Sequence, residues 1–128
     1  MAGVAYLDTS CLVAVAFDEP QGRGLAERLG GYDQLLSSAL LEAELLSTLA
    51  LEGVTADPRF LGAIGWVLPD RPLGPEVRRA LAHGYAKGAD LWHLATALYL
   101  AEDPSELPFF TLDPDQQAIA RALGFPVP

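Results

Sequence analysis

The feature that most constrains the fold is a short apolar run, residues 4–7, that ends at Asp8 and leads directly into a second apolar run over residues 11–17. Four apolar residues of this kind are typical of a strand buried on both faces of a parallel sheet. Asp8-Thr9-Ser10 is typical of a helix start, because such side chains accept hydrogen bonds from the first helical amides. The pattern predicts the first half of a βαβ unit, with Asp8 at the edge of the sheet where ligands bind.

The rest of the chain alternates in the same way, which predicts an α/β fold with a mainly parallel sheet. At 128 residues, the whole of 1–128 is expected to form a single domain. Further helices are predicted over residues 22–30, 38–52, 57–66, 74–87, 91–101 and 113–123, and further short strands over 34–36, 67–68, 107–112 and 125–128.

Composition narrows the class of protein. Hydrophobic residues make up 51% of the chain, but no apolar run reaches the ~18 residues of a membrane span, so no membrane association is expected. The first residues show no signal-peptide pattern. The single cysteine, Cys11, cannot form an internal disulfide, and this favours a reducing, cytoplasmic location.

The formal net charge of −9, with only eight lysines and arginines, argues against tight non-specific binding to nucleic acid. It is compatible with a site for divalent cations or with a basic protein partner.

Three aspartates, Asp8, Asp90 and Asp113, each precede an apolar helical run. One interpretation is that each is a helix N-cap, most clearly Asp113, where Pro114 and Gln116 complete a pattern close to a capping box. However, Asp8 and Asp113 also follow predicted strands, so they would lie close together at one edge of the sheet. Close carboxylates repel unless a cation neutralises them, and oxygen ligands of this kind suit Mg²⁺ or Mn²⁺. Spacing alone leaves both interpretations open.

The two histidines point to no separate site. His93 is expected to be a hydrogen-bonded core group or a support for the acids, and His83 to be solvated. Neither has the i, i+4 partner of a helical zinc site, and the chain has no glycine-rich phosphate loop.

Four segments carry a more specific pattern. They are Tyr-Leu-Asp-Thr-Ser at 6–10, Ser-Ser-Ala-Leu-Leu at 37–41 followed by Glu44 and Leu45, Asp-Leu-Trp-His-Leu-Ala-Thr-Ala at 90–97, and Thr-Leu-Asp at 111–113. In this order they resemble the motifs of PIN-domain ribonucleases, specifically the VapC-type toxins of VapBC toxin–antitoxin pairs.

The resemblance implies a three-layer α/β sandwich, whose central sheet has about four to five short strands flanked by helices. It also implies a Mg²⁺- or Mn²⁺-dependent endoribonuclease that cuts RNA, forms a homodimer and is silenced by a cognate antitoxin protein. Ser10 and Thr111 would orient carboxylates or bound water. The metal ligands and catalytic residues carried over from the family are Asp8, Glu44, Asp90 and Asp113.

The choice of Glu44 over Glu42 rests on the resemblance alone. The two positions lie about 200° apart around a helix, so both cannot face the aspartates, and leucines flank each of them. Two other functions stay open. The chain could be a catalytically weak PIN-fold binding module, or a small-molecule metal phosphoesterase that needs no basic surface.

Overall fold

The computed structural model describes residues 3–55 and 57–128 and shows a four-stranded sheet in the order β3-β2-β1-β4. Every pair of neighbouring strands is parallel, so the expectation of a mainly parallel sheet is confirmed. The strands are β1 (Val4–Leu7), β2 (Gln34–Ser38), β3 (Ile64–Val67) and β4 (Phe109–Phe110).

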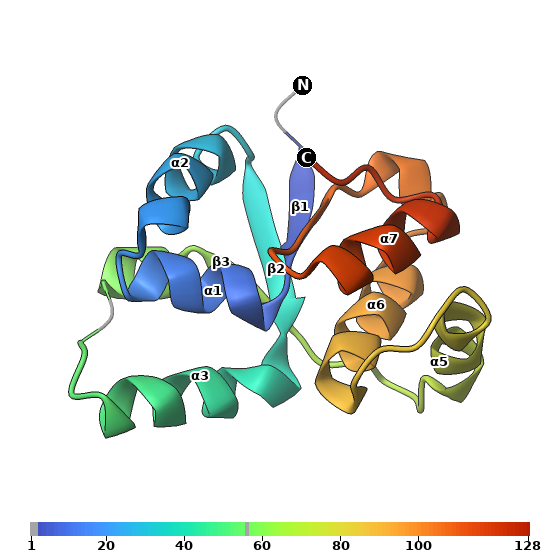
Figure 1. The fold of residues 1–128 in the computed structure, drawn as a ribbon, viewed down its shortest axis with the longest axis horizontal. Coiled ribbons are helices and arrows are strands. Elements are labelled where there is room, and N and C mark those ends of the chain that lie inside the picture. The colour runs from blue at the N-terminus through green and yellow to red at the C-terminus, as the bar shows by residue number, and fades with distance from the viewer. Residues whose placement is uncertain (1–2, 56) are drawn as a thin grey trace.

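Helices cover both faces of the sheet, which gives the expected three layers (Figure 1). α1 (Thr9–Ala16), α2 (Pro20–Leu29) and α3 (Ala39–Leu51) lie on the left in Figure 1, and α5 (Gly74–Leu81), α6 (Gly88–Leu100) and α7 (Pro114–Leu123) lie on the right. The short helix α4 (Pro58–Gly62) precedes β3, and a 3₁₀ turn, η1 (Pro104–Glu106), precedes β4.

The core has two halves, one on each face of the sheet. Successive side chains of a strand point to opposite faces, and β1 shows this directly. Leu7 packs with α1, α2 and α3, whereas Tyr6 packs with α5, α6 and α7. Phe110 and Phe109 of β4 divide in the same way. The run 4–7 is apolar throughout because both faces of β1 are covered.

The region between α3 and α5 differs from the prediction. The helix expected over 57–66 ends at Gly62, and the strand expected over 67–68 is instead Ile64–Val67. Gly65 lies in that strand, and a Cβ placed there would come within 2.8 Å of Leu36 Cδ2 on β2. A side chain at this position would therefore displace the Leu36 methyl group, and the structure places in a strand a residue that the sequence assigned to a helix.

Two further boundaries were predicted too long. The helix expected to reach residue 87 stops at Leu81, and Gly84 then adopts φ +150°. Near the C-terminus, only Phe109 and Phe110 of the expected strand 107–112 are extended and paired. No strand forms over the described residues 125–128, although Phe109 N donates to Pro126 O at 2.8 Å. Prolines supply no amide with which that pairing could continue. In the part of the chain that the structure describes, no helix is long and apolar enough to cross a membrane.

Candidate active site

The carboxyl ends of β1 and β4 lie side by side and place Asp8 next to Thr111. Leu7 pairs with Phe110, and the Asp8 amide donates to Phe110 O at 3.1 Å. Asp8 is only 2% exposed and caps α1 by accepting a hydrogen bond from Cys11 N at 3.0 Å. Its position is thus fixed by the strand before it and the helix after it.

Two hydroxyl groups hold the Asp8 carboxylate. Ser10 Oγ donates to Asp8 Oδ1 at 2.7 Å and accepts from Leu112 N at 3.0 Å. Thr111 Oγ1 lies 2.6 Å from Asp8 Oδ2 and accepts from Asp113 N at 3.1 Å. Ser10 and Thr111 therefore contact the Asp8 carboxylate, as the resemblance implied. They also link the carboxyl ends of β1 and β4.

The sequence interpretation missed the part that Gln116 plays. Its side chain is fully buried, with Oε1 2.7 Å from Thr111 Oγ1 and Nε2 donating to Asp90 O at 3.2 Å. A capping box would have turned this side chain back to the Asp113 amide, but Thr111 occupies that amide. Gln116 thus connects α7 with α6 and the Asp8 cluster. In the sequence, the sign that Gln116 contributes to this region is its position three residues after Asp113.

Asp113 and Asp90 reach the same region from α7 and α6. Asp113 caps α7 by accepting from Asp115 N at 2.9 Å and Gln116 N at 3.4 Å, as the cap interpretation predicted. Asp90 is not a cap: it is the third residue of α6, after the N-cap Lys87, and its carboxylate is not needed to begin the helix.

The charges of the three aspartates affect one another's ionisation. Burial raises the pKa of Asp8 above its usual value, although hydrogen bonds from Thr111, Ser10 and Cys11 oppose the shift. Burial also raises the pKa of Asp90, and the charges of Asp113 and Asp8 add to the shift. Mutual repulsion of this kind is what a bound cation relieves.

Asp90 and Asp113 line a hollow of about 80 Å³, the acidic hollow, together with Tyr85, Ala86, Lys87, Asp115 and Gln116. Within residues 3–55 and 57–128, no three carboxylate, imidazole or thiol groups are gathered closely enough to hold one metal ion. The donor set nevertheless fits a hard divalent cation, because it consists of oxygen ligands with excess negative charge.

The structure does not bring Glu44 to the aspartates. Glu44 is exposed, and across the described chain its carboxylate takes part in no hydrogen bond or ion pair. Glu42 is half-buried and lies three residues before the buried Leu45, on the same side of α3. α3 itself begins beside α6, because Trp92 Nε1 donates to Ser38 Oγ at 2.8 Å.

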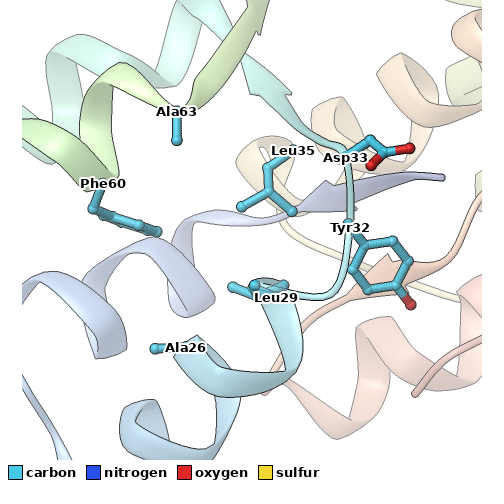
Figure 2. Close-up of a pocket in the computed structure, with 8 residues that line it drawn as sticks. Ala26, Leu29, Tyr32, Asp33, Leu35, Phe60 and Ala63 are labelled. Carbon is cyan, nitrogen blue, oxygen red and sulfur yellow. The ribbon is translucent and has the colours of Figure 1, made fainter. Parts of the chain in front are cut away.

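A separate cavity of about 230 Å³ lies between α2, β2 and α4 and shares no residue with the acidic hollow (Figure 2). Leu29, Leu35 and Phe60 extend into it, with Tyr32 and Asp33 at one side. Its walls are mainly apolar, and Asp33 is the one ionisable carboxylate among the described residues that line it.

His93 connects α6 to the start of α1. The Thr9 amide donates to His93 Nε2 at 3.1 Å, so Nε2 accepts and Nδ1 carries the proton towards Tyr6 OH, 2.8 Å away. The ring is fully buried, and burial lowers the pKa of His93 to about 3. His93 is therefore the hydrogen-bonded core group that was expected, and it is neutral. His83 is exposed, also as expected.

We expect His93 to make folding sensitive to acid. Its pKa of about 3 in the folded chain lies below the ordinary 6.5, so the unfolded chain takes up a proton first as the pH falls. The stability that neutral His93 supports is complete above pH ~6.5 and declines towards pH ~3, by at most about 1.4 kcal/mol per pH unit.

The measurement is the difference in unfolding free energy between wild type and His93→Gln, which cancels the opposite contributions of Asp8 and Asp90. That difference should shrink by about 2–3 kcal/mol between pH 7 and pH 4.5. The exposed His83→Gln variant is the matched control. An equal difference at both pH values would contradict the expectation.

Comparison with known proteins gives one match. The model of a family described as PIN domain matches residues 5–122, which is nearly the whole chain. No curated protein and no solved structure matched. Domains of this family are generally nucleases, and they typically use divalent metal ions. The parallel sheet with helices on both faces agrees with the PIN fold, and the family match runs from within β1 to within α7. The chain belongs to the PIN domain family.

Proposed function

We propose that this chain is a Mg²⁺- or Mn²⁺-dependent endoribonuclease and the toxin component of a type II toxin–antitoxin pair of the VapBC kind. The observation that carries the nuclease proposal is the convergence of Asp8, Asp90 and Asp113 from β1, α6 and α7, where the charges of two of them raise the pKa of the third. The toxin role rests on the resemblance of four motifs.

The chemistry of the residues fits a divalent ion, although no three acids of the described chain are grouped closely enough in this structure to hold one. Asp8, Asp90 and Asp113 would hold it, with Glu44 as the fourth acid on the strength of the resemblance. Such an ion activates water and screens charge on the phosphate. The chain's own task is to hold the acids, and Ser10 and Thr111 fix Asp8 by hydrogen bonds of 2.7 and 2.6 Å. His93 cannot serve as a base, because both ring nitrogens are used inside the core.

The proposal includes two protein partners, a cognate antitoxin and a second copy of the chain. Two features support it. α3 leaves Leu40 and Leu46 exposed, at 56% and 46%, and the cavity in Figure 2 has mainly apolar walls. Exposed leucines and an apolar hollow of this kind are available for contact with a partner protein. A cytoplasmic location follows from the same proposal.

The net charge of −9 favours one alternative function, that of a phosphoesterase acting on small molecules, because such an enzyme needs no basic surface. The two enzymes differ in substrate. We expect Mn²⁺-dependent cleavage of structured RNA and none of bis(p-nitrophenyl) phosphate. Hydrolysis of the small ester without cleavage of RNA would favour the phosphoesterase. RNA binding without cleavage would favour a catalytically weak binding module.

We expect cleavage to depend wholly on a divalent cation, because the acidic hollow gathers carboxylate oxygens, which are the ligands that such a cation prefers. Excess EDTA should reduce RNA cleavage to background, and added Mg²⁺ or Mn²⁺ should restore it. The measurement is the initial cleavage rate of a labelled RNA, and Zn²⁺ serves as a control for non-specific restoration. Cleavage at an undiminished rate in EDTA would contradict the proposal.

A further inference from the structure

Tyr85 is the one aromatic side chain that the described chain leaves largely in water. It is 81% exposed, whereas every other tyrosine, tryptophan and phenylalanine is buried or half-buried. An isolated exposed apolar residue needs no explanation by itself. Tyr85 differs because it lines the acidic hollow with Asp90 and Asp113.

The loop between α5 and α6 keeps the Tyr85 ring outside. Gly84 has φ +150°, which side chains rarely adopt, and a Cβ there would lie 3.4 Å from Ile119 Cγ1 on α7. Ala86, on the other side, is 7% exposed and belongs to the core. Because Ala86 is anchored in the core and Gly84 adopts a backbone conformation that side chains rarely adopt, the loop holds the ring between them in solvent. The loop therefore presents a flat aromatic surface at the rim of the acidic hollow.

The segment around Tyr85 is basic in an acidic protein. Three of the chain's eight cations, Arg78, Arg79 and Lys87, lie within ten residues, and no acid occurs between Glu76 and Asp90. All three are exposed, and Lys87 lines the acidic hollow. A segment with this charge attracts phosphates, which the net charge of −9 would otherwise repel.

Aromatic side chains beside a basic surface are typical of sites for single-stranded nucleic acid. Cations follow the phosphates, and the bases stack on the rings whatever their identity. Sequence-tolerant stacking requires unpaired bases, which double-stranded RNA does not offer. A ring at the rim of the hollow would hold a base close to the phosphate that lies at the acids.

We propose that Tyr85 stacks on an unpaired nucleobase of the RNA next to the scissile phosphate, and that Lys87, which lines the same hollow, attracts the phosphates of that strand. Tyr85 is then a positioning residue that selects single-stranded substrate. The inference rests on the proposed ribonuclease function and adds to it the conformation of the substrate.

The test compares Tyr85→Leu, Tyr85→Phe and Leu51→Ala with wild type. Leu51 is 83% exposed on α3 and lines neither the acidic hollow nor the basic segment, so Leu51→Ala controls for loss of an exposed apolar side chain. The substrates are a labelled single-stranded RNA pool of random sequence, about 20 nucleotides long to exceed the site size of single-strand binders, and a fully paired duplex. The readouts are KM and kcat in Mn²⁺, and RNA affinity by fluorescence anisotropy in an Asp8→Asn background, where the RNA stays intact.

We expect Tyr85→Leu to raise KM and weaken binding of the single strand by roughly 5- to 150-fold, the range for one lost base stack, with kcat nearly unchanged. Tyr85→Phe should recover most of the affinity, because it keeps the ring. Duplex RNA should show no difference among the variants.

Two outcomes would overturn the inference in distinguishable ways. If wild type cleaves the single strand and Tyr85→Leu cleaves it with the same KM, the base contact is wrong but the ribonuclease stands, and the ring is free to contact a protein instead. If wild type neither cleaves nor binds RNA, the ribonuclease proposal fails, and the base contact fails with it.

Discussion

Asp8→Asn should abolish metal-dependent RNA cleavage and leave a chain at least as stable as wild type. Asp8 is 2% exposed, and burial raises its pKa. Its charge therefore opposes folding at neutral pH. Asparagine removes that charge and, with it, one of the carboxylates that we propose for the metal site, so activity and stability should change in opposite directions.

The surroundings offer a hydrogen-bond partner to each polar atom of the amide. The Oδ1 atom of the asparagine would keep the hydrogen bonds from Cys11 N and Ser10 Oγ, at 3.0 and 2.7 Å in wild type. Its Nδ2 would donate to Thr111 Oγ1, and the Thr111 proton has a second acceptor in Gln116 Oε1, 2.7 Å away. Because asparagine also caps helices as well as aspartate does, α1 keeps its N-cap.

The measurements are the rate of RNA cleavage in Mn²⁺ and the thermal unfolding midpoint without metal. The midpoint of Asp8→Asn should equal or exceed that of wild type at pH 7. The advantage should shrink as the pH falls through the raised pKa of Asp8, because wild type then becomes neutral there too. Asp18→Asn, which changes an exposed carboxylate, is the matched control. An active Asp8→Asn would show that Asp8 is only a helix cap.

The start of the chain could be predicted because each local signal agreed with the fold. Residues 4–7 are apolar on both faces of β1, and Asp8 both ends the strand and caps α1. Local signals also agree with the fold in α7, where Pro114 marks the start of the helix and Gly124 its end. Where propensity, capping and burial agree, a sequence specifies its structure locally.

The middle of the chain could not be predicted because its structure depends on distant partners. Residues 64–67 form a strand by pairing with β2, some thirty residues earlier in the chain, whereas the sequence predicted helix as far as residue 66. Gln116 shows the same limit within the candidate site. Its spacing from Asp113 indicated a local capping box, but its amide group bridges Thr111 and Asp90. Only the packed arrangement of α6 against α7 creates that bridge.

The fourth acid of the site is Glu44 according to the resemblance, whereas burial on α3 would favour Glu42. The motif that begins at Ser38 assigns Glu44, six residues later. In the structure Glu44 is exposed, and Glu42 is half-buried on the side of α3 that carries Leu45. Neither carboxylate is held by another residue of the described chain. Both lie within about two turns of Ser38, which is tied to α6 by Trp92.

We expect Glu44→Gln to lose metal-dependent cleavage and to weaken Mn²⁺ binding measured by calorimetry, while Glu42→Gln behaves as wild type. The choice of Glu44 rests on the resemblance, which places the family acid six residues after Ser38, and no hydrogen bond or ion pair of the described chain holds the Glu44 carboxylate elsewhere. Glu42 is the natural control, because it lies on the same helix, has the same chemistry and points about 200° away. Reversed results would mean that the second motif is out of register by two residues, and Glu42 would then replace Glu44 as the metal ligand.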